Sequence, residues 1–191
     1  MKKITGIIGC LLLLAFGSSY ASAGDSKESG GSIPSPLIGL EGGINLANLH
    51  GSNAGETYKS RLGFVGGAFV NIHLSPHLAL QPELLYEQKG GKINGNTYKL
   101  DYVEVPTLLE ITLGGHGLNP GILVGPAFNS NVASHGVVNV KKSDVGLVLG
   151  GQVAITKFIV SARYEIGLND VNSNENLKNG TFTLLVGYSI L

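Results

Sequence analysis

Residues 61–74, RLGFVGGAFVNIHL, alternate between two kinds of position. Arg61, Asn71 and His73 stand at odd positions, and the even positions carry Leu62, Phe64, Gly66, Ala68, Val70, Ile72 and Leu74. A period of two residues places successive side chains on opposite faces of a β-strand. The stretch therefore predicts a strand with one apolar face and one more polar face.

The same alternation recurs along most of the chain. It is present in eight segments: 37–48, 61–74, 78–89, 98–113, 120–130, 143–155, 158–169 and 180–191. Such segments, separated by turn-forming residues, are typical of strands. The sequence thus predicts an all-β chain with eight strands.

The connections between these segments alternate in length. Long polar loops are expected at 49–60, 88–98, 131–142 and 170–179, and short turns at 75–77, 114–119 and 156–157. Outer-membrane barrels combine short periplasmic turns with longer external loops. We therefore expect an eight-stranded antiparallel up-and-down transmembrane β-barrel over residues 37–191, with both termini in the periplasm.

The composition of the less apolar face of the strands distinguishes a membrane barrel from a soluble one. In a soluble lipocalin-like barrel that face meets water and carries many Lys, Glu and Thr residues. Here it is rich in small residues: Gly63, Gly67, Gly125, Ala127, Gly146, Gly150, Ala154, Gly167 and Gly187. Small side chains suit the crowded lumen of an eight-stranded barrel. We favour the membrane barrel and keep a soluble lipocalin-like ligand binder as the weaker alternative.

The N-terminus predicts export. Lys2 and Lys3 precede an apolar run from Ile7 to Phe16, and Ala21-Ser22-Ala23 has the small-x-small form of a signal peptidase site. We expect residues 1–23 to be a signal peptide and the polar residues 24–36 to be a periplasmic linker. Removal of the signal peptide leaves no cysteine, which excludes disulfide and thiol chemistry in the mature chain.

Five segments carry a resemblance to a known family. They are LQPELLYEQKGG (80–91), YVEVPTLLEI (102–111), GPAF (125–128), SDVGLVLGGQV (143–153) and ARYEIGLNDV (162–171). In this order they resemble the outer-membrane β-barrel domain often labelled porin-family in Gram-negative bacteria. The resemblance implies an eight-stranded barrel similar in architecture to the OmpA and OmpX type. The chain departs from such barrels in having no Trp and in ending with GYSIL rather than an aromatic residue.

The lumen-facing positions collect ionisable residues, which must be paired or hydrogen-bonded when buried. They are Glu41, Arg61, Glu83, Glu87, Lys89, Glu104, Glu110, Asp144, Arg163 and Glu165. The predicted polar network of the lumen consists of Glu41, Arg61, Glu83, Glu104, Asp144, Arg163 and Glu165.

Arg163 is placed to reach Glu83, Glu104 and Glu165 across a narrow lumen. Because the carboxylates outnumber the cations, some carboxylates must lie at the wet rims or take up a proton. We interpret the network as a polar plug that holds the barrel shut. An ion pathway or a proton relay is the alternative.

No pattern indicates catalysis, a metal or a cofactor. The histidines His50, His73, His77, His116 and His135 show no metal-ligand spacing on one strand. None stands at a predicted lipid-facing position, where a Ser-His pair of a lipid-modifying enzyme would need it. The formal net charge is zero and no basic patch stands out in the sequence, which argues against nucleic-acid binding.

The expected role is structural or interactive, through four external loops whose ligand the sequence does not identify. The expected partners are outer-membrane lipid and the assembly machinery of that membrane, and the barrel is expected to be a monomer. A channel for ions or small solutes is the second hypothesis.

Overall fold

The computed structural model describes residues 36–50, 58–93, 96–114, 118–135, 143–168 and 178–190. The predicted signal peptide and all of the predicted linker except its last residue lie outside this part of the chain. Eight strands form: β1 (Leu37–His50), β2 (Tyr58–Ser75), β3 (Leu78–Ile93), β4 (Asn96–Thr112), β5 (Asn119–His135), β6 (Ser143–Ile155), β7 (Phe158–Gly167) and β8 (Lys178–Ser189). In the described residues, no helix is long and apolar enough to cross a membrane.

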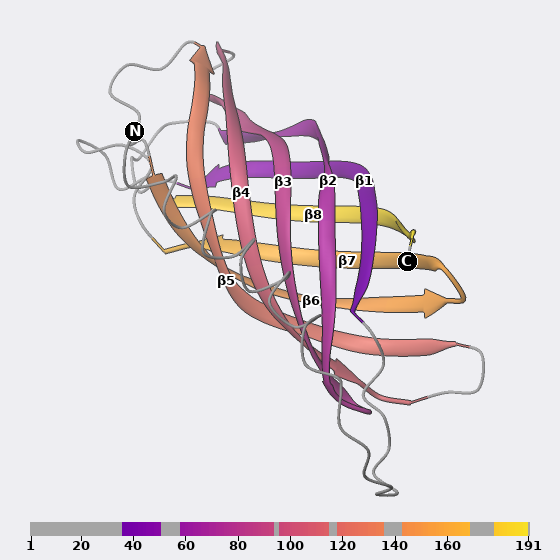
Figure 1. The fold of residues 1–191 in the computed structure, drawn as a ribbon. Helices are drawn as coiled ribbons and strands as arrows, with labels where there is room; N and C mark the ends of the chain where they lie inside the picture. Colours follow the sequence, from indigo (N-terminus) through magenta and orange to yellow (C-terminus); the bar gives the residue numbers. More distant parts are fainter. Residues whose placement is uncertain are drawn as a thin grey trace, which may run out of the picture. The chain divides into compact units, whose positions relative to one another are not determined.

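Each strand pairs antiparallel with the next, and β1 pairs with β8 to close the barrel (Figure 1). The closing seam continues past the last strand residue, because the Ile190 amide donates to the Ile38 carbonyl at 2.8 Å. Ile190 therefore lies beside the start of β1, at the end of the barrel with the short turns. The predicted fold class, an eight-stranded antiparallel up-and-down barrel, is confirmed.

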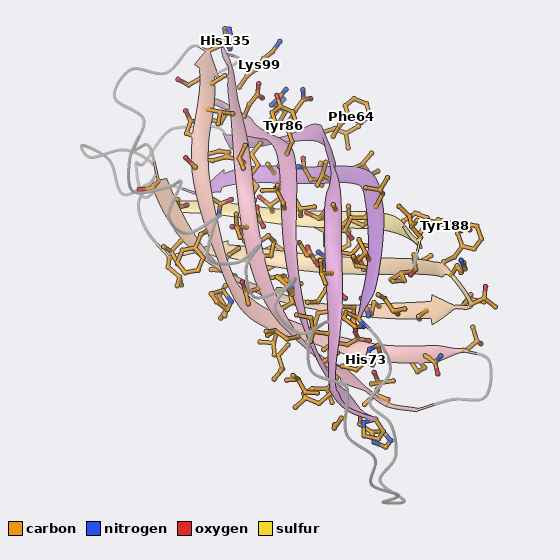
Figure 2. The ribbon with its side chains drawn as sticks, in the orientation of Figure 1. Phe64, His73, Tyr86, Lys99, His135 and Tyr188 are labelled. Carbon is orange, nitrogen blue, oxygen red and sulfur yellow. The ribbon has the colours of Figure 1, made fainter. Side chains whose placement is uncertain are left out.

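The two faces of the strands are distributed as the sequence predicts for a membrane barrel. Large apolar side chains point away from the lumen, with Phe64 68 % exposed and Leu62 61 % exposed. Polar side chains on the other face are buried, among them Asn71, Gln81 and Glu83. Figure 2 shows Phe64 and Tyr188 projecting from the outside of the barrel wall. The soluble lipocalin-like alternative is wrong, because it requires the apolar face to be inside.

Strands β2 to β5 extend further toward the long-loop end than predicted. The predicted long loop at 88–98 is wrong, because β3 continues to Ile93 and β4 begins at Asn96, with these two residues paired. Only Asn94 and Gly95 separate the two strands, and Asn-Gly is a strong hairpin signal. The polar residues here continue the strands beyond the apolar band, so their polarity alone does not distinguish them from a loop. Strand β5 likewise extends to His135, into the predicted loop 131–142.

Candidate functional site in the barrel lumen

Lys89, on β3, is the centre of the larger charged group in the lumen. Its side chain is 1 % exposed, and its Nζ donates to Glu104 Oε2 at 2.6 Å, to Asn129 Oδ1 at 3.2 Å and to Glu165 Oε2. Glu87 Oε2 lies 3.0 Å from the same nitrogen. We call these five residues the Lys89 cluster. It joins β3, β4, β5 and β7 across the lumen.

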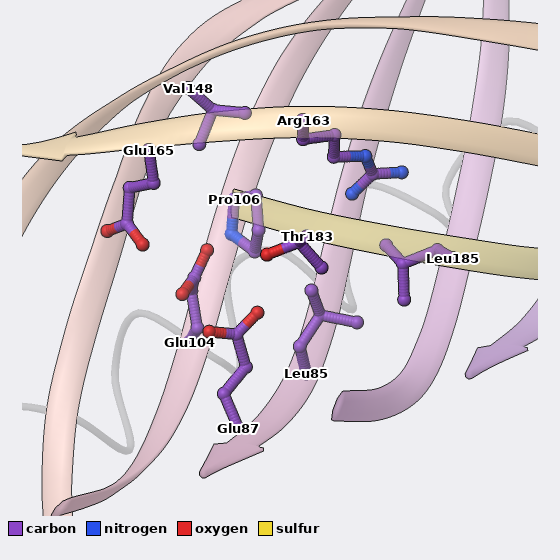
Figure 3. A pocket seen from close by; sticks show the side chains of 9 residues that line it. All are labelled: Leu85, Glu87, Glu104, Pro106, Val148, Arg163, Glu165, Thr183 and Leu185. Atoms are coloured by element: carbon purple, nitrogen blue, oxygen red, sulfur yellow. The ribbon is translucent and has the colours of Figure 1, made fainter. Parts of the chain in front are cut away.

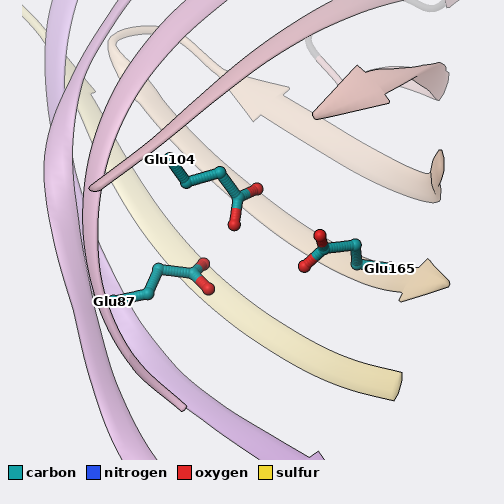
Figure 4. A group of neighbouring side chains, drawn as sticks. All are labelled: Glu87, Glu104 and Glu165. Carbon is teal, nitrogen blue, oxygen red and sulfur yellow. The ribbon is translucent and has the colours of Figure 1, made fainter. Parts of the chain in front are cut away.

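The three carboxylates of the Lys89 cluster point toward one another (Figure 4). Their nearest oxygens, from Glu87, Glu104 and Glu165, all lie within 4.8 Å of one another. Carboxylate oxygens at such spacing suit a hard cation. In this barrel the Lys89 ammonium lies among them and supplies the positive charge.

Two further contacts hold the Lys89 side chain and its backbone. The ammonium lies 5.7 Å from the centroid of the Tyr102 ring, within the range of a cation–π interaction. Arg61, on β2, donates from Nη1 to the backbone carbonyl of Lys89. Asn129 also donates from Nδ2 to Glu165 Oε1 at 2.6 Å, so the amide orients that carboxylate.

Arg163, on β7, forms a second charged group. Its Nη1 lies 2.5 Å from Glu83 Oε2, and its Nη2 lies 3.3 Å from Glu41 Oε2. All three side chains are buried. We call them the Arg163 cluster, which connects β7 to β3 and β1.

A chain of amides continues from the Arg163 cluster toward the short-turn end. Gln81 Nε2 donates to Glu83 Oε1 at 2.7 Å, and Asn71 Nδ2 donates to Gln81 Oε1 at 3.0 Å. Asn71 Nδ2 also donates to Glu110 Oε2. Because an amide both donates and accepts, Gln81 and Asn71 connect the carboxylates of Glu83 and Glu110 through a chain of hydrogen bonds.

Apolar side chains fill the lumen between the polar groups. One buried group contains Val65, Leu85 and Leu185, and another contains Leu108, Leu123, Ala127 and Val148. A cavity beside them leaves about 10 Å³ for the centre of a water molecule. Residues of both charged clusters line it, namely Glu87, Glu104, Glu165 and Arg163 (Figure 3). A space of this size holds about one water.

The structure separates the predicted network into groups. Glu41 and Glu83 form ion pairs with Arg163, whereas Glu104 and Glu165 form ion pairs with Lys89. The expectation that Arg163 reaches Glu104 and Glu165 is therefore wrong.

The other two predicted members make backbone contacts. Arg61 donates to a backbone carbonyl, as described above. Asp144 Oδ1 accepts a hydrogen bond from the Val145 amide at 2.7 Å. Asp144 lies on β6, where its register partner is Asn129 of the Lys89 cluster.

The predicted network does not contain Lys89, Asn71 or Asn129, which the structure places in the hydrogen-bonded groups of the lumen. Strand alternation places these residues in the lumen, so that signal was available. Amide side chains carry no charge, so a pattern of ionisable residues does not include them. The sequence also does not indicate whether a buried lysine or a buried arginine is the centre of the larger charged group.

A family model described as outer membrane protein beta-barrel domain matches residues 34–173. The fold is similar to solved structures of Neisserial surface protein A (TM-score 0.52, 15 % identity, covering 80 % of this chain and 97 % of that one). It is also similar to the outer membrane protein OprG from Pseudomonas aeruginosa (TM-score 0.52, 11 % identity, covering 81 % and 95 %). A third similar structure is the outer membrane enzyme PagL (TM-score 0.52, 10 % identity, covering 76 % and 99 %). No curated protein matched the sequence.

Proposed function

This chain belongs to the family of outer membrane protein β-barrel domains, and from that premise we propose that it is a closed barrel with a structural or surface-interaction role. The interaction is carried by the connections at the long-loop end, which face the exterior in barrels of this architecture. Its partners are outer-membrane lipid, the assembly machinery during biogenesis and a ligand of the external connections. It is exported by residues 1–23 and works as a monomer.

The observation that carries this proposal is the packing of the lumen. The Lys89 cluster spans four strands, the Arg163 cluster joins three, and apolar side chains pack between them. The cavity that borders both clusters is about the size of one water. Eight strands enclose an interior just wide enough for side chains to fill. A filled lumen supports a role at the surface of the barrel rather than through it.

Conductance across a planar bilayer tests the closed lumen. We expect the reconstituted protein to give only small and rare current steps. A stable, large and ohmic conductance would contradict the proposal and favour the channel hypothesis. In that case Arg163→Gln and Glu104→Gln should change the ion selectivity, because both residues would line the pore.

We further propose that the barrel has no catalytic activity. PagL is an outer membrane enzyme, and at 10 % identity its likeness to this chain shows the fold alone. His77 lies in the turn between β2 and β3, whereas His135 ends β5, so these two exposed histidines stand at opposite ends of the barrel. Incubation with lipid A followed by mass spectrometry tests this proposal, and loss of an acyl chain would contradict it.

A further inference from the structure

Lysine and histidine positions are paired in register at the long-loop ends of the strands. Three cross-strand register pairs there join only lysine and histidine: His50 with Lys178, Lys59 with Lys92, and Lys99 with His135. These residues are far apart in the sequence and come from six strands. The barrel therefore collects at one end basic residues that form no run in the chain.

Three basic residues of the β2–β5 wall are exposed at the long-loop end of the barrel. Lys59, Lys99 and His135 have exposed side chains. Figure 2 shows Lys99 and His135 at the same end of the barrel, with Tyr86 and Phe64 further along the wall. Lys99 lies four residues beyond Val103, the register partner of Tyr86. Four residues of strand measure about 13 Å.

The lysine side chains at this position are within reach of the headgroup layer of a membrane. Exposed aromatic residues such as Phe64 and Tyr86 mark the interface in barrels of this type. The headgroup region extends several ångströms beyond the hydrocarbon core. A lysine side chain can lie along the barrel wall and still place its ammonium in the polar layer.

Pairing two lysines across strands, as Lys59 pairs with Lys92, has an energetic cost. Like charges directly opposite one another destabilise a sheet. The acidic residue nearest to Lys99 on the outer face of β4 is Asp101, which is half-buried. An external anion bound between the basic side chains would replace this repulsion with attraction. The arrangement therefore favours a partner with concentrated negative charge.

We propose that Lys59 and Lys99, with His135, form a lysine patch that binds the phosphate groups of phosphorylated lipid headgroups in the outer leaflet. Lysine binds phosphate as a point charge, and a lysine near an anionic membrane surface strengthens attachment. The wall that carries the patch also carries the apolar band below it, so its neighbour at this depth is lipid. This inference rests on the outer-membrane placement of the barrel, and not on its closed lumen.

Lipid binding in nanodiscs tests the proposal. The folded protein is placed in phosphatidylcholine nanodiscs that contain either diphosphoryl lipid A or dephosphorylated lipid A with the same acyl chains. Bound lipid A is then titrated by native mass spectrometry. We expect retention of the diphosphoryl form, with Lys99→Gln weakening it about fivefold and Lys59→Gln with Lys99→Gln about twentyfold. Gel mobility of unboiled samples shows that each variant is folded.

Lys157→Gln is the matched control. Lys157 is also exposed, but it lies in the short turn between β6 and β7, with its Nζ 6.0 Å from the Tyr188 ring centroid and 3.4 Å from the Ile190 carbonyl. We expect this variant to retain lipid A like the unmodified protein. An equal loss in Lys157→Gln, equal binding of the dephosphorylated lipid, or no loss in the double variant would each overturn the proposal. A barrel that conducts ions could still bind lipid A as expected here. The lipid-binding experiment and the conductance experiment therefore test the two proposals independently.

Discussion

A substitution that removes the Lys89 ammonium affects three carboxylates. Its ammonium contacts Glu87, Glu104 and Glu165, all of which are buried. Replacing a complete buried ion pair with apolar groups is often neutral, whereas removing one partner leaves an uncompensated charge. The contribution of Lys89 is thus best measured by removing it alone and then together with one partner.

We expect Lys89→Met to lower the free energy of unfolding by about 3–5 kcal/mol, because it leaves the carboxylates without their cation. Adding Glu104→Gln should recover part of this loss, since the two residues are in direct contact. Urea unfolding in lipid vesicles, followed by gel mobility of unboiled samples, measures both effects. Lys157→Met, at an exposed lysine, is the control. A Lys89→Met barrel as stable as this control would show that the Lys89 cluster contributes little.

Gly66 and Gly67 are adjacent on β2 but meet different surroundings. A Cβ on Gly67 would lie 1.9 Å from the Leu84 carbonyl oxygen, whereas a Cβ on Gly66 would have Glu41 O as its nearest contact at 3.5 Å. We expect Gly67→Ala to destabilise the barrel by about 1–3 kcal/mol, because the neighbouring backbone must move. Gly66→Ala should be close to neutral. The same unfolding assay compares them, and equal stability of the two variants would contradict the close approach of β2 and β3.

At the scale of the element, strand β2 displays the alternation on which the fold depends. Val70 belongs to its outward side and is half-buried, while Asn71 is 4 % exposed in the lumen. Asn71 donates to Gln81 and Glu110, so carboxylate oxygens lie within reach of a longer side chain at this position. One strand therefore offers two adjacent positions in opposite environments.

Val70→Arg should destabilise the barrel in lipid more than Asn71→Arg. An arginine on the lipid face costs roughly 2–4 kcal/mol at the midplane and less toward the interfaces, whereas an arginine at position 71 can pair with Glu110. Refolding of both variants in vesicles and in plain buffer provides the measurement. Folding of the unmodified protein in buffer, with Asn71→Arg harmless there, would indicate that the polar face meets water.

For the whole molecule, the distribution of apolar surface determines where the barrel can fold. Large side chains from every strand are exposed on the outside, including Leu40 at 57 %, Leu149 at 59 % and Val186 at 56 %. An apolar surface of this extent around a closed barrel is stable in lipid and prone to association in water. Closure of the barrel also leaves no unpaired strand edge between β1 and β8, which pair with each other.

Cell fractionation tests this at the level of the whole protein. We expect the protein in the outer-membrane fraction, where the unboiled form migrates differently from the boiled form on a gel because the barrel stays folded in detergent. Refolding of purified protein should require lipid or detergent. Recovery as a soluble periplasmic protein would contradict both expectations.

The sequence by itself determined the eight strands, the face that each presents to lipid and the residues that point into the lumen. These properties are local, because a period of two residues is visible within any one strand. The β3–β4 connection was also available in the sequence, since Asn94-Gly95 marks a hairpin that the polar residues around it obscured.

Only the tertiary structure decided which charges meet. Glu83 and Arg163 are 80 residues apart, Lys89 and Glu165 are 76 apart, and Glu41 and Arg163 are 122 apart. The lysine patch has the same origin, because Lys59, Lys99 and His135 come from β2, β4 and β5, and strand pairing brings them to the same end of the barrel. Register and closure fix these contacts through the pairing of whole strands around the barrel, and no single strand carries that information.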